Sequence, residues 1–367
     1  MKEEPKLTID VYNSITYVDK KEWDSLNKDE DDIFVSWDFC KVIEDSFKDV
    51  PLFFIVVRKD RRAVGKAVFS ILKIQISQFI SNRYKRLAEQ LFKLTGLSGH
   101  HRMLYCGIPV SVCQSSLRFH DPAALGIIIH KLNQISDKER IKLIALGQFC
   151  ESEVKAIKNY MPKDFVLLPS LPDHKLVRHF EDYDQYLSSL SKNQRSNMRK
   201  SLRKVSGMDI KIVKEYYQSF TKEDYGLYLN VNNKAEIKLE TLPFEFFINF
   251  NKAFKNSFII QIKNRQKTIG YGLTLKTKAV VHSMFVGLDY EESRSHNLLM
   301  NIFIAQINSL IEEKGNHLIF GQTSSYVKQK MGCEKIPSFV FVKQKKFRLL
   351  SKPLFMLAPI LFRPSNK

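Results

Sequence analysis

Short apolar runs and amphipathic helical segments alternate along the first half of the chain. Apolar residues that recur every three or four positions predict helices, and apolar runs bounded by turn residues predict strands. Strands alternating with helices are typical of an α/β or α+β domain. The first half should contain strands at 7–15, 52–57, 63–72 and 141–146, and helices at 36–47, 122–135 and 151–160.

The second half starts after residues 168–173, a stretch with two prolines and no periodicity that we interpret as a linker. We therefore expect an N-terminal domain over 1–170, a C-terminal domain over 171–345 and a tail over 346–367. The expected order in the second half is strand 175–179, a helix from 181, helix 191–205, strand 209–213, helices 222–230 and 243–255, strands 257–262, 268–275 and 279–286, helix 294–313, strand 317–320, helix 323–331 and strand 338–343.

Composition adds a strong positive charge to this picture. The chain has 367 residues, with 58 lysines and arginines against 39 aspartates and glutamates, a formal net charge of +19. The length fits two domains, and a hydrophobic content of 44% excludes a disordered or fibrous chain. A pI near 9.5 indicates a polyanionic partner, such as nucleic acid, a phosphorylated metabolite or an acidic membrane surface. A lysine-rich proteome would explain part of the excess without any partner.

The most basic segment is the predicted helix 191–205. Arg195, Arg199 and Arg203 are four residues apart, so they share one helix face beside an apolar stripe. Guanidinium groups at this spacing repel one another unless an anion lies among them, and they match phosphate oxygens well. The face either binds a phosphate-bearing ligand or is a solvated helix surface.

This helix, closed by Gly207 and followed by the strand Asp209–Val213, resembles the basic motif of the FemAB-like aminoacyl and acyl transferases. The element order from residue 209 resembles an acetyltransferase-like (GNAT) module, and the first half resembles a degenerate copy. The resemblance implies an α/β chain with two tandem GNAT-like domains, each a mixed, mostly antiparallel sheet flanked by helices. It also implies that Arg195 and Arg199 contact phosphate, with Arg203 beside them.

A second candidate segment begins at Gly321, directly after a predicted strand, where polar side chains and free backbone N–H groups gather at the start of a helix. Gln322, Ser324 and Ser325 are candidate substrate or phosphate contacts, and Thr323 or Ser324 suits the N-cap. A capped short helix is the alternative interpretation. The segment is similar to the last helix of GNAT enzymes, in which a tyrosine donates a proton.

Lys328 lies four residues before Gly332, which suits the left-handed residue that ends a helix. A lysine ahead of a terminal glycine resembles the FemAB-like branch. The resemblance implies that Lys328 stabilises negative charge on a tetrahedral carbonyl intermediate. Tyr326 is a second candidate proton donor.

The stretch that begins at His282 runs from a strand into a long helix, where GNAT enzymes carry a glycine-rich loop for the pyrophosphate of coenzyme A. Ser293 and Ser295 stand where glycines are expected, which again resembles the FemAB-like branch. His282 is a candidate base for an amine acceptor or a core histidine. Arg294 is a further candidate phosphate contact, and Asp289 should cap or turn the chain.

Two stretches, 80–95 and the tail 346–367, combine cations with apolar residues. Such a composition suits the interface of an anionic membrane, or an arm packed on the body of the protein. No window is long enough to span a bilayer, and the charged start lacks a signal peptide. The five cysteines are scattered, so we expect no metal site. The protein should be cytoplasmic, with a peripheral contact at the inner face of the membrane.

Three functional hypotheses follow. The first is an N-acyltransferase with acyl-CoA as donor substrate, no tightly bound cofactor, and a hydrophobic or lipid amine as acceptor. The second is an aminoacyl-tRNA-dependent transferase acting on a peptidoglycan precursor. The third is a non-enzymatic membrane- or RNA-binding protein on a transferase scaffold. The chain lacks a Walker A loop, a G-x-S-x-G elbow, an H-E-x-x-H motif and a G-x-G-x-x-G loop, which argues against kinases, serine hydrolases, zinc proteases and Rossmann dehydrogenases.

Overall fold

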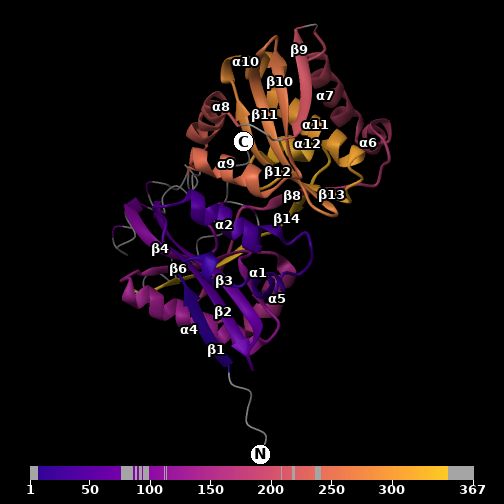
Figure 1. Cartoon of the computed structure of the whole chain (residues 1–367). Coiled ribbons are helices and arrows are strands. Elements are labelled where there is room, and N and C mark those ends of the chain that lie inside the picture. Colours follow the sequence, from indigo (N-terminus) through magenta and orange to yellow (C-terminus); the bar gives the residue numbers. More distant parts are fainter. Residues whose placement is uncertain are drawn as a thin grey trace, which may run out of the picture. The chain divides into compact units, whose positions relative to one another are not determined.

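The chain forms two compact units in the computed structural model (Figure 1). Unit 1 runs to Leu171 and resumes at Pro337, and unit 2 comprises Pro172–Ile336. The stretch 80–95 lies almost wholly, and the tail from residue 346 wholly, outside the described residues. The structure describes residues 7–75, 86, 89–90, 93, 99–110, 112, 114–207, 209–216, 220–235 and 241–345.

Unit 1 is built on a mixed sheet with the strand order β1-β2-β3-β4-β6-β15-β7, and β5 pairs with β3. Its strands are β1 (Leu7–Tyr12), β2 (Leu52–Lys59), β3 (Arg62–Gln75), β4 (His100–Cys106), β5 (Leu117–Phe119), β6 (Leu143–Phe149), β7 (Val166–Pro169) and β15 (Phe339–Gln344). Its described helices are α1 (Lys20–Asp24), α2 (Trp37–Ser46), α4 (Pro122–Lys138) and α5 (Glu151–Ile157), with 3-10 turns at Ile15–Tyr17, Ile33–Val35 and Lys158–Tyr160.

Unit 2 has a second mixed sheet with the order β14-β8-β13-β12-β11-β10-β9. Its strands are β8 (Asp173–Val177), β9 (Ile210–Tyr216), β10 (Ser257–Asn264), β11 (Lys267–Lys276), β12 (Val280–Leu288), β13 (His317–Ile319) and β14 (Glu334–Ile336). Its described helices are α6 (Tyr183–Ser189), α7 (Lys192–Arg203), α8 (Lys222–Lys234), α9 (Phe244–Ala253), α10 (Tyr290–His296), α11 (Leu298–Glu312) and α12 (Ser325–Lys330).

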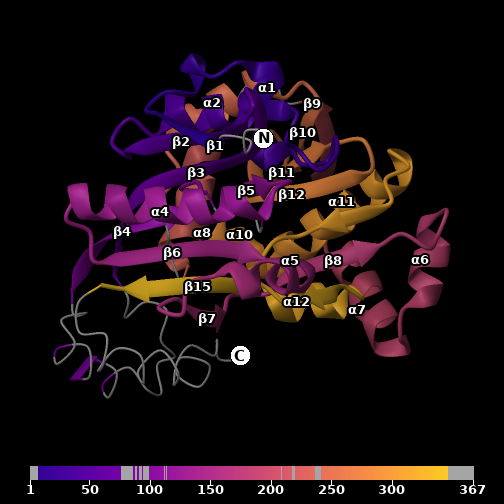
Figure 2. The ribbon, with the colours of Figure 1, turned by 90° about the horizontal axis from the view of Figure 1, so that it is seen from below.

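The two sheets share one plan. Each has one parallel pair of neighbouring strands, β4 with β6 and β12 with β13, and the other described pairs are antiparallel. Two strands, β8 and β15, are exchanged between the sheets and do not pair with the strand that precedes them in the chain. Strand β8 follows β7 in the chain but pairs with β13 and β14, and β15 follows β14 but pairs with β6 and β7 (Figure 2). The prediction of two similar α/β halves is confirmed.

The exchange corrects two details of the predicted organisation. Residues 168–173, interpreted as a linker, contain the end of β7 and the start of β8. The strand predicted at 338–343 belongs to the sheet of unit 1, although the sequence placed it in the C-terminal domain. Strand β14, which the sequence analysis missed, completes the second sheet instead.

Two layers of helices enclose the second sheet (Figure 1). On one face, glycines of β11 let α11 approach closely, since a Cβ at Gly272 would lie 2.5 Å from Cγ2 of Ile302. On the other face, aromatic side chains of α9 pack on β12, with the rings of Phe247 and Phe285 5.9 Å apart. The second sheet therefore has one face that packs on α11 and an opposite face that packs on α9.

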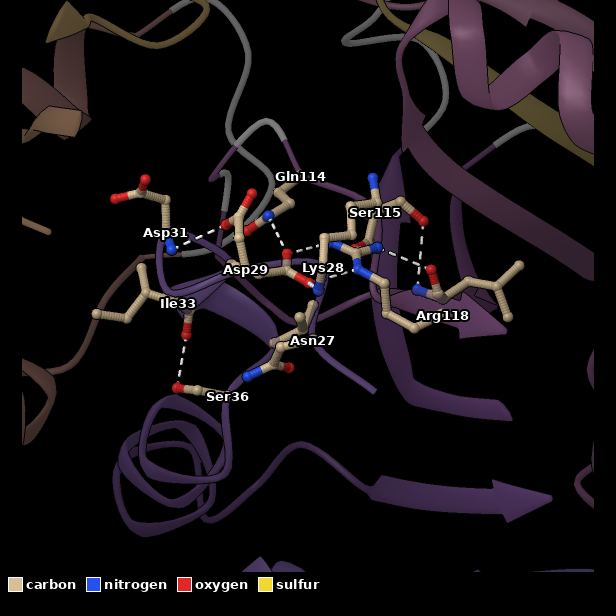
Figure 3. A network of polar contacts seen from close by, with 12 residues as sticks. Asn27, Lys28, Asp29, Asp31, Ile33, Ser36, Gln114, Ser115 and Arg118 are labelled. Atoms are coloured by element: carbon tan, nitrogen blue, oxygen red, sulfur yellow. Dashed lines mark hydrogen bonds and ion pairs between the residues drawn. The ribbon is translucent and has the colours of Figure 1, made fainter. Parts of the chain in front are cut away.

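A buried ion pair fixes the segment between α1 and α2 in unit 1 (Figure 3). The Arg118 guanidinium donates to both carboxylate oxygens of Asp32, at 2.7 and 2.5 Å, and to the carbonyl oxygens of Ser115 and Leu117. The backbone N–H of Lys28 donates to the same carboxylate at 2.9 Å. The pair is satisfied by further hydrogen bonds, as a buried pair must be.

Candidate active site

The parallel strands of unit 2 stop pairing after three residues. Val280, Val281 and His282 of β12 pair with the three residues of β13. Strand β12 then continues to Leu288, and within the described residues it pairs from Ser283 onward with β11 alone. Among the described strands, none pairs with the other backbone edge of β12 beyond His282, although the Leu288 carbonyl accepts from the Asn230 side chain at 3.2 Å.

The chain beyond β13 makes a tight turn into α12. Gly321 has φ +77° and Ser324 has φ +58°, so both adopt left-handed conformations. The turn is held by Lys328, whose side chain is buried and whose Nζ donates to the carbonyl oxygens of Phe320 at 2.6 Å and Gly321 at 2.9 Å. The predicted role of Lys328 toward a substrate oxyanion would require its ammonium to leave these carbonyls.

His174 of β8 joins the same turn and is fully buried. Its Nδ1 lies 3.0 Å from the carbonyl oxygen of Gly321, which can only accept a hydrogen bond, so Nδ1 carries the proton. Its Nε2 must then accept, and the Ser325 hydroxyl, 2.9 Å away, donates to it. Burial lowers the pKa of His174 to about 4, helped by the charges of Lys328 and Lys335, although the hydrogen bond to Gly321 acts in the opposite direction. The imidazole is neutral at pH 7.

These contacts form one hydrogen-bonded chain, which we call the Lys328–Ser325 relay: Lys328, the Gly321 carbonyl, His174 and Ser325. Lys328 and Ser325 were predicted as site residues, whereas His174 was not. The available signal was weak, since His174 shares a face of β8 with the buried Leu176, so a polar residue occupies an apolar position. Its partner lies 151 residues away, which no local pattern reveals.

His282 lies apart from this relay. In register, His282 pairs with Ile319, which pairs with Lys175, so these three residues share one face of the sheet. His174 directly precedes Lys175 on β8, so its side chain faces the opposite side of the sheet. Leu176 shares that side and packs in the same core cluster as α11. The sheet therefore separates His282, which is 8% exposed, from the relay.

The basic helix α7 has two kinds of arginine. The Arg195 guanidinium donates to the carbonyl oxygens of Ser188, at 3.3 Å, and Leu190, and so caps the end of α6. This contact gives Arg195 a structural partner that the sequence did not predict. Arg199 and Arg203 are exposed and keep their cations at the surface.

Contacts at its two ends attach the helix α7 to α12 and α10. At one end the Gln194 side chain donates to the carbonyl oxygen of Gln329 at 3.0 Å. At the other end Lys204 Nζ donates to the carbonyl oxygen of Arg294 at 2.9 Å, and the Arg294 side chain is exposed. Because Met198 of α7 packs in the same core cluster as Ile302 of α11, α7 lies on the α11 face of the sheet, as the relay does.

The remaining candidates are spread around α12. Tyr326 is 65% exposed, and Lys330 Nζ lies 4.0 Å from its ring centre. Gln322 is buried. Ser324 occupies the N-cap position, but its side chain forms no capping hydrogen bond. Gly332 has φ +81°, as predicted for the end of this helix.

The predicted long helix 294–313 is wrong in its first turns. Asp289 caps α10, as its expected role as a cap or turn residue requires, and accepts from the N–H of Glu291 at 3.1 Å. Asn297, with φ +48°, then breaks the helix, and α11 begins at Leu298. Asparagine tolerates this left-handed conformation better than most residues, which is why the break falls there.

None of the helices among the described residues combines the length and hydropathy needed to cross a lipid bilayer. In the same part of the chain, no group of three or more histidine, cysteine, aspartate or glutamate side chains could hold a metal ion.

Comparison with known proteins gives a match in structure. A scan of protein-family models and a search of curated proteins each return no match. Among solved structures, FemX aligns with a TM-score of 0.52 and 11% identity over 93% of this chain and 98% of its own. A tandem GNAT protein from the clavulanic acid biosynthesis pathway aligns with a TM-score of 0.54 and 11% identity over 93% and 99%.

A third solved structure is the C-terminal domain attributed to a lysylphosphatidylglycerol synthetase from Agrobacterium fabrum. It aligns with a TM-score of 0.54 and 9% identity over 94% of this chain and 98% of that domain. At identities this low, the structural match establishes the fold alone, and any function must be argued from the site. The chain has the tandem GNAT fold of the FemAB-like type.

Proposed function

We propose that the chain is an N-acyltransferase that moves an acyl group from a phosphate-bearing donor, acyl-CoA, to an amine. The observation that carries the proposal is the Lys328–Ser325 relay, which lies directly beyond the point where β12 and β13 cease to pair. The unpaired edge of β12 offers backbone N–H and C=O groups to an extended, amide-bearing donor arm. The exposed Arg199 and Arg203 supply charge for its phosphates.

In the proposed reaction the amine nitrogen attacks the thioester carbon, the C–N bond forms and the C–S bond breaks. Because the Ser325 hydroxyl donates its proton to His174 Nε2, the Ser325 oxygen can accept a hydrogen bond from the attacking amine. The amine proton passes to Ser325 as the Ser325 proton passes to His174. An imidazole whose pKa is about 4 gives the proton up again, and the leaving thiolate receives it. No covalent enzyme intermediate is needed.

In this proposal Lys328 is a positioning residue. Its ammonium and the His174 Nδ1–H both donate to the Gly321 carbonyl, which fixes the imidazole tautomer. Its positive charge also opposes protonation of His174 and keeps Nε2 ready to accept a proton.

An aminoacyl-tRNA donor with a peptidoglycan precursor as acceptor is the second candidate. The exposed cations of α7 and the likeness to FemX favour it. Acetyl-CoA, a long-chain acyl-CoA and charged tRNA should be compared as donors in a thermal-shift screen, followed by mass spectrometry of an amine acceptor. A donor at about one hundred times its dissociation constant stabilises the chain by about 2.7 kcal/mol. Binding of tRNA without any transfer would instead support a non-enzymatic role.

Removing the relay serine should lower kcat about a hundredfold, since a positioned acid–base group contributes at least that factor. Ser325→Ala deletes the hydroxyl, and His174→Asn keeps a donor for Gly321 but deletes the Nε2 acceptor. Both variants should lose the same factor, and the double variant should lose no more, because the two groups act as one unit.

Ser188→Ala is the matched control, because the hydroxyl of this exposed serine donates within α6, to the carbonyl of Asp184 at 2.8 Å, and the substitution keeps the Ser188 carbonyl that accepts from Arg195. Its kcat should equal that of the wild type. A wild-type kcat in Ser325→Ala would exclude the relay while leaving acyl transfer itself standing. Failure of the wild-type chain to transfer from any of the three donors would exclude acyl transfer.

A further inference from the structure

Unit 2 contains a cavity of about 1330 Å³ that shares no residue with the Lys328–Ser325 relay. It is bounded by α8, by the strands β9, β10 and β11, and by Asp289 at the start of α10. Gln261, one of its lining residues, pairs in register with Tyr271, which lies between Gly270 and Gly272 on β11, and both glycines face α11 residues such as Ile302. The cavity therefore lies on the α8 face of the sheet, opposite the α11 face to which His174 points.

The cavity wall carries both signs of charge in a strongly basic protein. The whole chain carries +19, yet acidic side chains outnumber basic ones at this opening. A polyanion gains little from such a wall, whereas a ligand with both charges finds a partner for each. Lys214 borders the cavity, but its ammonium pairs with Glu312 and Glu313 at the end of α11. The other charged lining residues are Glu215, Glu223, Asp224 and Asp289 against Lys263 and Lys267.

Several of these charges already have fixed partners. Asp224 accepts from the backbone N–H and hydroxyl of Thr221, and Asp289 pairs with Lys267 at 2.9 Å. Glu223, by contrast, lies on the exposed first turn of α8, and Lys263 meets Glu215 at a loose 3.7 Å. A carboxylate and an ammonium group thus remain accessible to a ligand at this opening.

A buried amide marks the floor of the cavity. Gln261 is 9% exposed, and its Oε1 has no hydrogen-bond partner among the described residues. Its backbone is held on both sides, by Val213 of β9 and Tyr271 of β11, so the residue cannot withdraw. A buried, unpaired acceptor is unfavourable in the empty protein, and rotation about the soft terminal torsion would offer it to an N–H donor.

We infer that this cavity binds a short zwitterionic peptide, with its ammonium group at Glu223, its carboxylate at Lys263 and an amide N–H on Gln261. The volume exceeds the usual range of small-ligand pockets, which favours a peptide over a single amino acid.

Calorimetric titration of the full chain, with no donor present, tests the site. The probes are L-alanyl-L-lysine, free L-lysine, and N-acetyl-L-alanyl-L-lysine amide, which lacks both terminal charges. The dipeptide should bind, its blocked form about tenfold or more weakly, and Gln261→Leu should weaken the dipeptide about tenfold. Glu223→Gln should weaken the dipeptide but not the blocked form.

Gln306→Leu is the matched control. Gln306 is also buried with an unpartnered Oε1 among the described residues, but it lies on α11 and donates to Thr274 on the other face of the sheet, at 2.9 Å. Dipeptide affinity in this variant should equal that of the wild type. Far-UV circular dichroism should show that Gln261→Leu folds, since the change removes an unpaired buried oxygen.

Equal dipeptide binding by wild type and Gln261→Leu, no binding at millimolar dipeptide, or preference for free L-lysine would each overturn the inference. The proposed function fails separately. If the chain binds the dipeptide through Gln261 but transfers no acyl group, the binding site is supported and the proposed reaction is excluded. Acyl transfer by a chain that does not bind the dipeptide would support the reaction and exclude the site.

Discussion

Replacing Lys328 by methionine should destabilise unit 2 by about 2–3 kcal/mol, because the Phe320 carbonyl loses its ammonium donor in a buried turn and the Gly321 carbonyl keeps only His174. Methionine fills a similar volume, so the cost arises from the lost hydrogen bonds. Both tryptophans lie in unit 1, so their fluorescence does not report on this unit. Amide exchange of peptides covering β8 and β13 does, and it should accelerate about thirty- to hundredfold.

The same variant should raise the pKa of His174 above its value of about 4, since the positive charge of Lys328 helps to hold that pKa down. NMR titration of the imidazole measures this shift, which loss of stability alone would not produce. Lys330→Met is the control, because Lys330 lies on the same helix against the exposed Tyr326 ring. It should change neither exchange nor the His174 pKa. An unaltered His174 pKa in Lys328→Met would remove Lys328 from the relay.

Local patterns were sufficient to predict most elements and several of their ends. Asp289 caps α10, and Gly332 ends α12 in the left-handed conformation, because each role depends on residues a few positions away. The break at Asn297 was missed because the apolar stripe of α11 begins only after it, and no residue of α10 is buried. A stripe records burial and does not register a single left-handed residue.

Long-range pairing could not be predicted in the same way. The exchange of β8 and β15 depends on which of the two sheets each strand joins, and neither short strand carries a local pattern that specifies its partner strands. His174 reaches Ser325 only because β8 inserts between β13 and β14. Contacts within a contiguous motif, such as the turn around Lys328, therefore lie within reach of sequence patterns, whereas the contact that the distant strand β8 adds through His174 does not.

Breaking the buried ion pair of unit 1 should have the largest effect on stability. Arg118→Met leaves the Asp32 carboxylate buried without its main counter-charge, and we expect a loss of about 3–5 kcal/mol in the free energy of unfolding. Trp23 and Trp37 both lie in unit 1, so urea unfolding followed by tryptophan fluorescence isolates this change.

The control is Arg102→Met, which breaks the exposed pair with Glu139 at 3.0 Å and should cost no more than about 1 kcal/mol. Burial alone would raise the pKa of Asp32, but the hydrogen bonds and charge of Arg118 and the N–H of Lys28 hold it below the ordinary 3.8. A lowered folded-state pKa stabilises the protein above that ordinary value, and the contribution is lost as the pH falls through the folded-state pKa. The wild type should therefore lose stability below about pH 4 more steeply than Arg118→Met. Equal unfolding midpoints for Arg118→Met and Arg102→Met would show that the pair in Figure 3 does not hold unit 1 together.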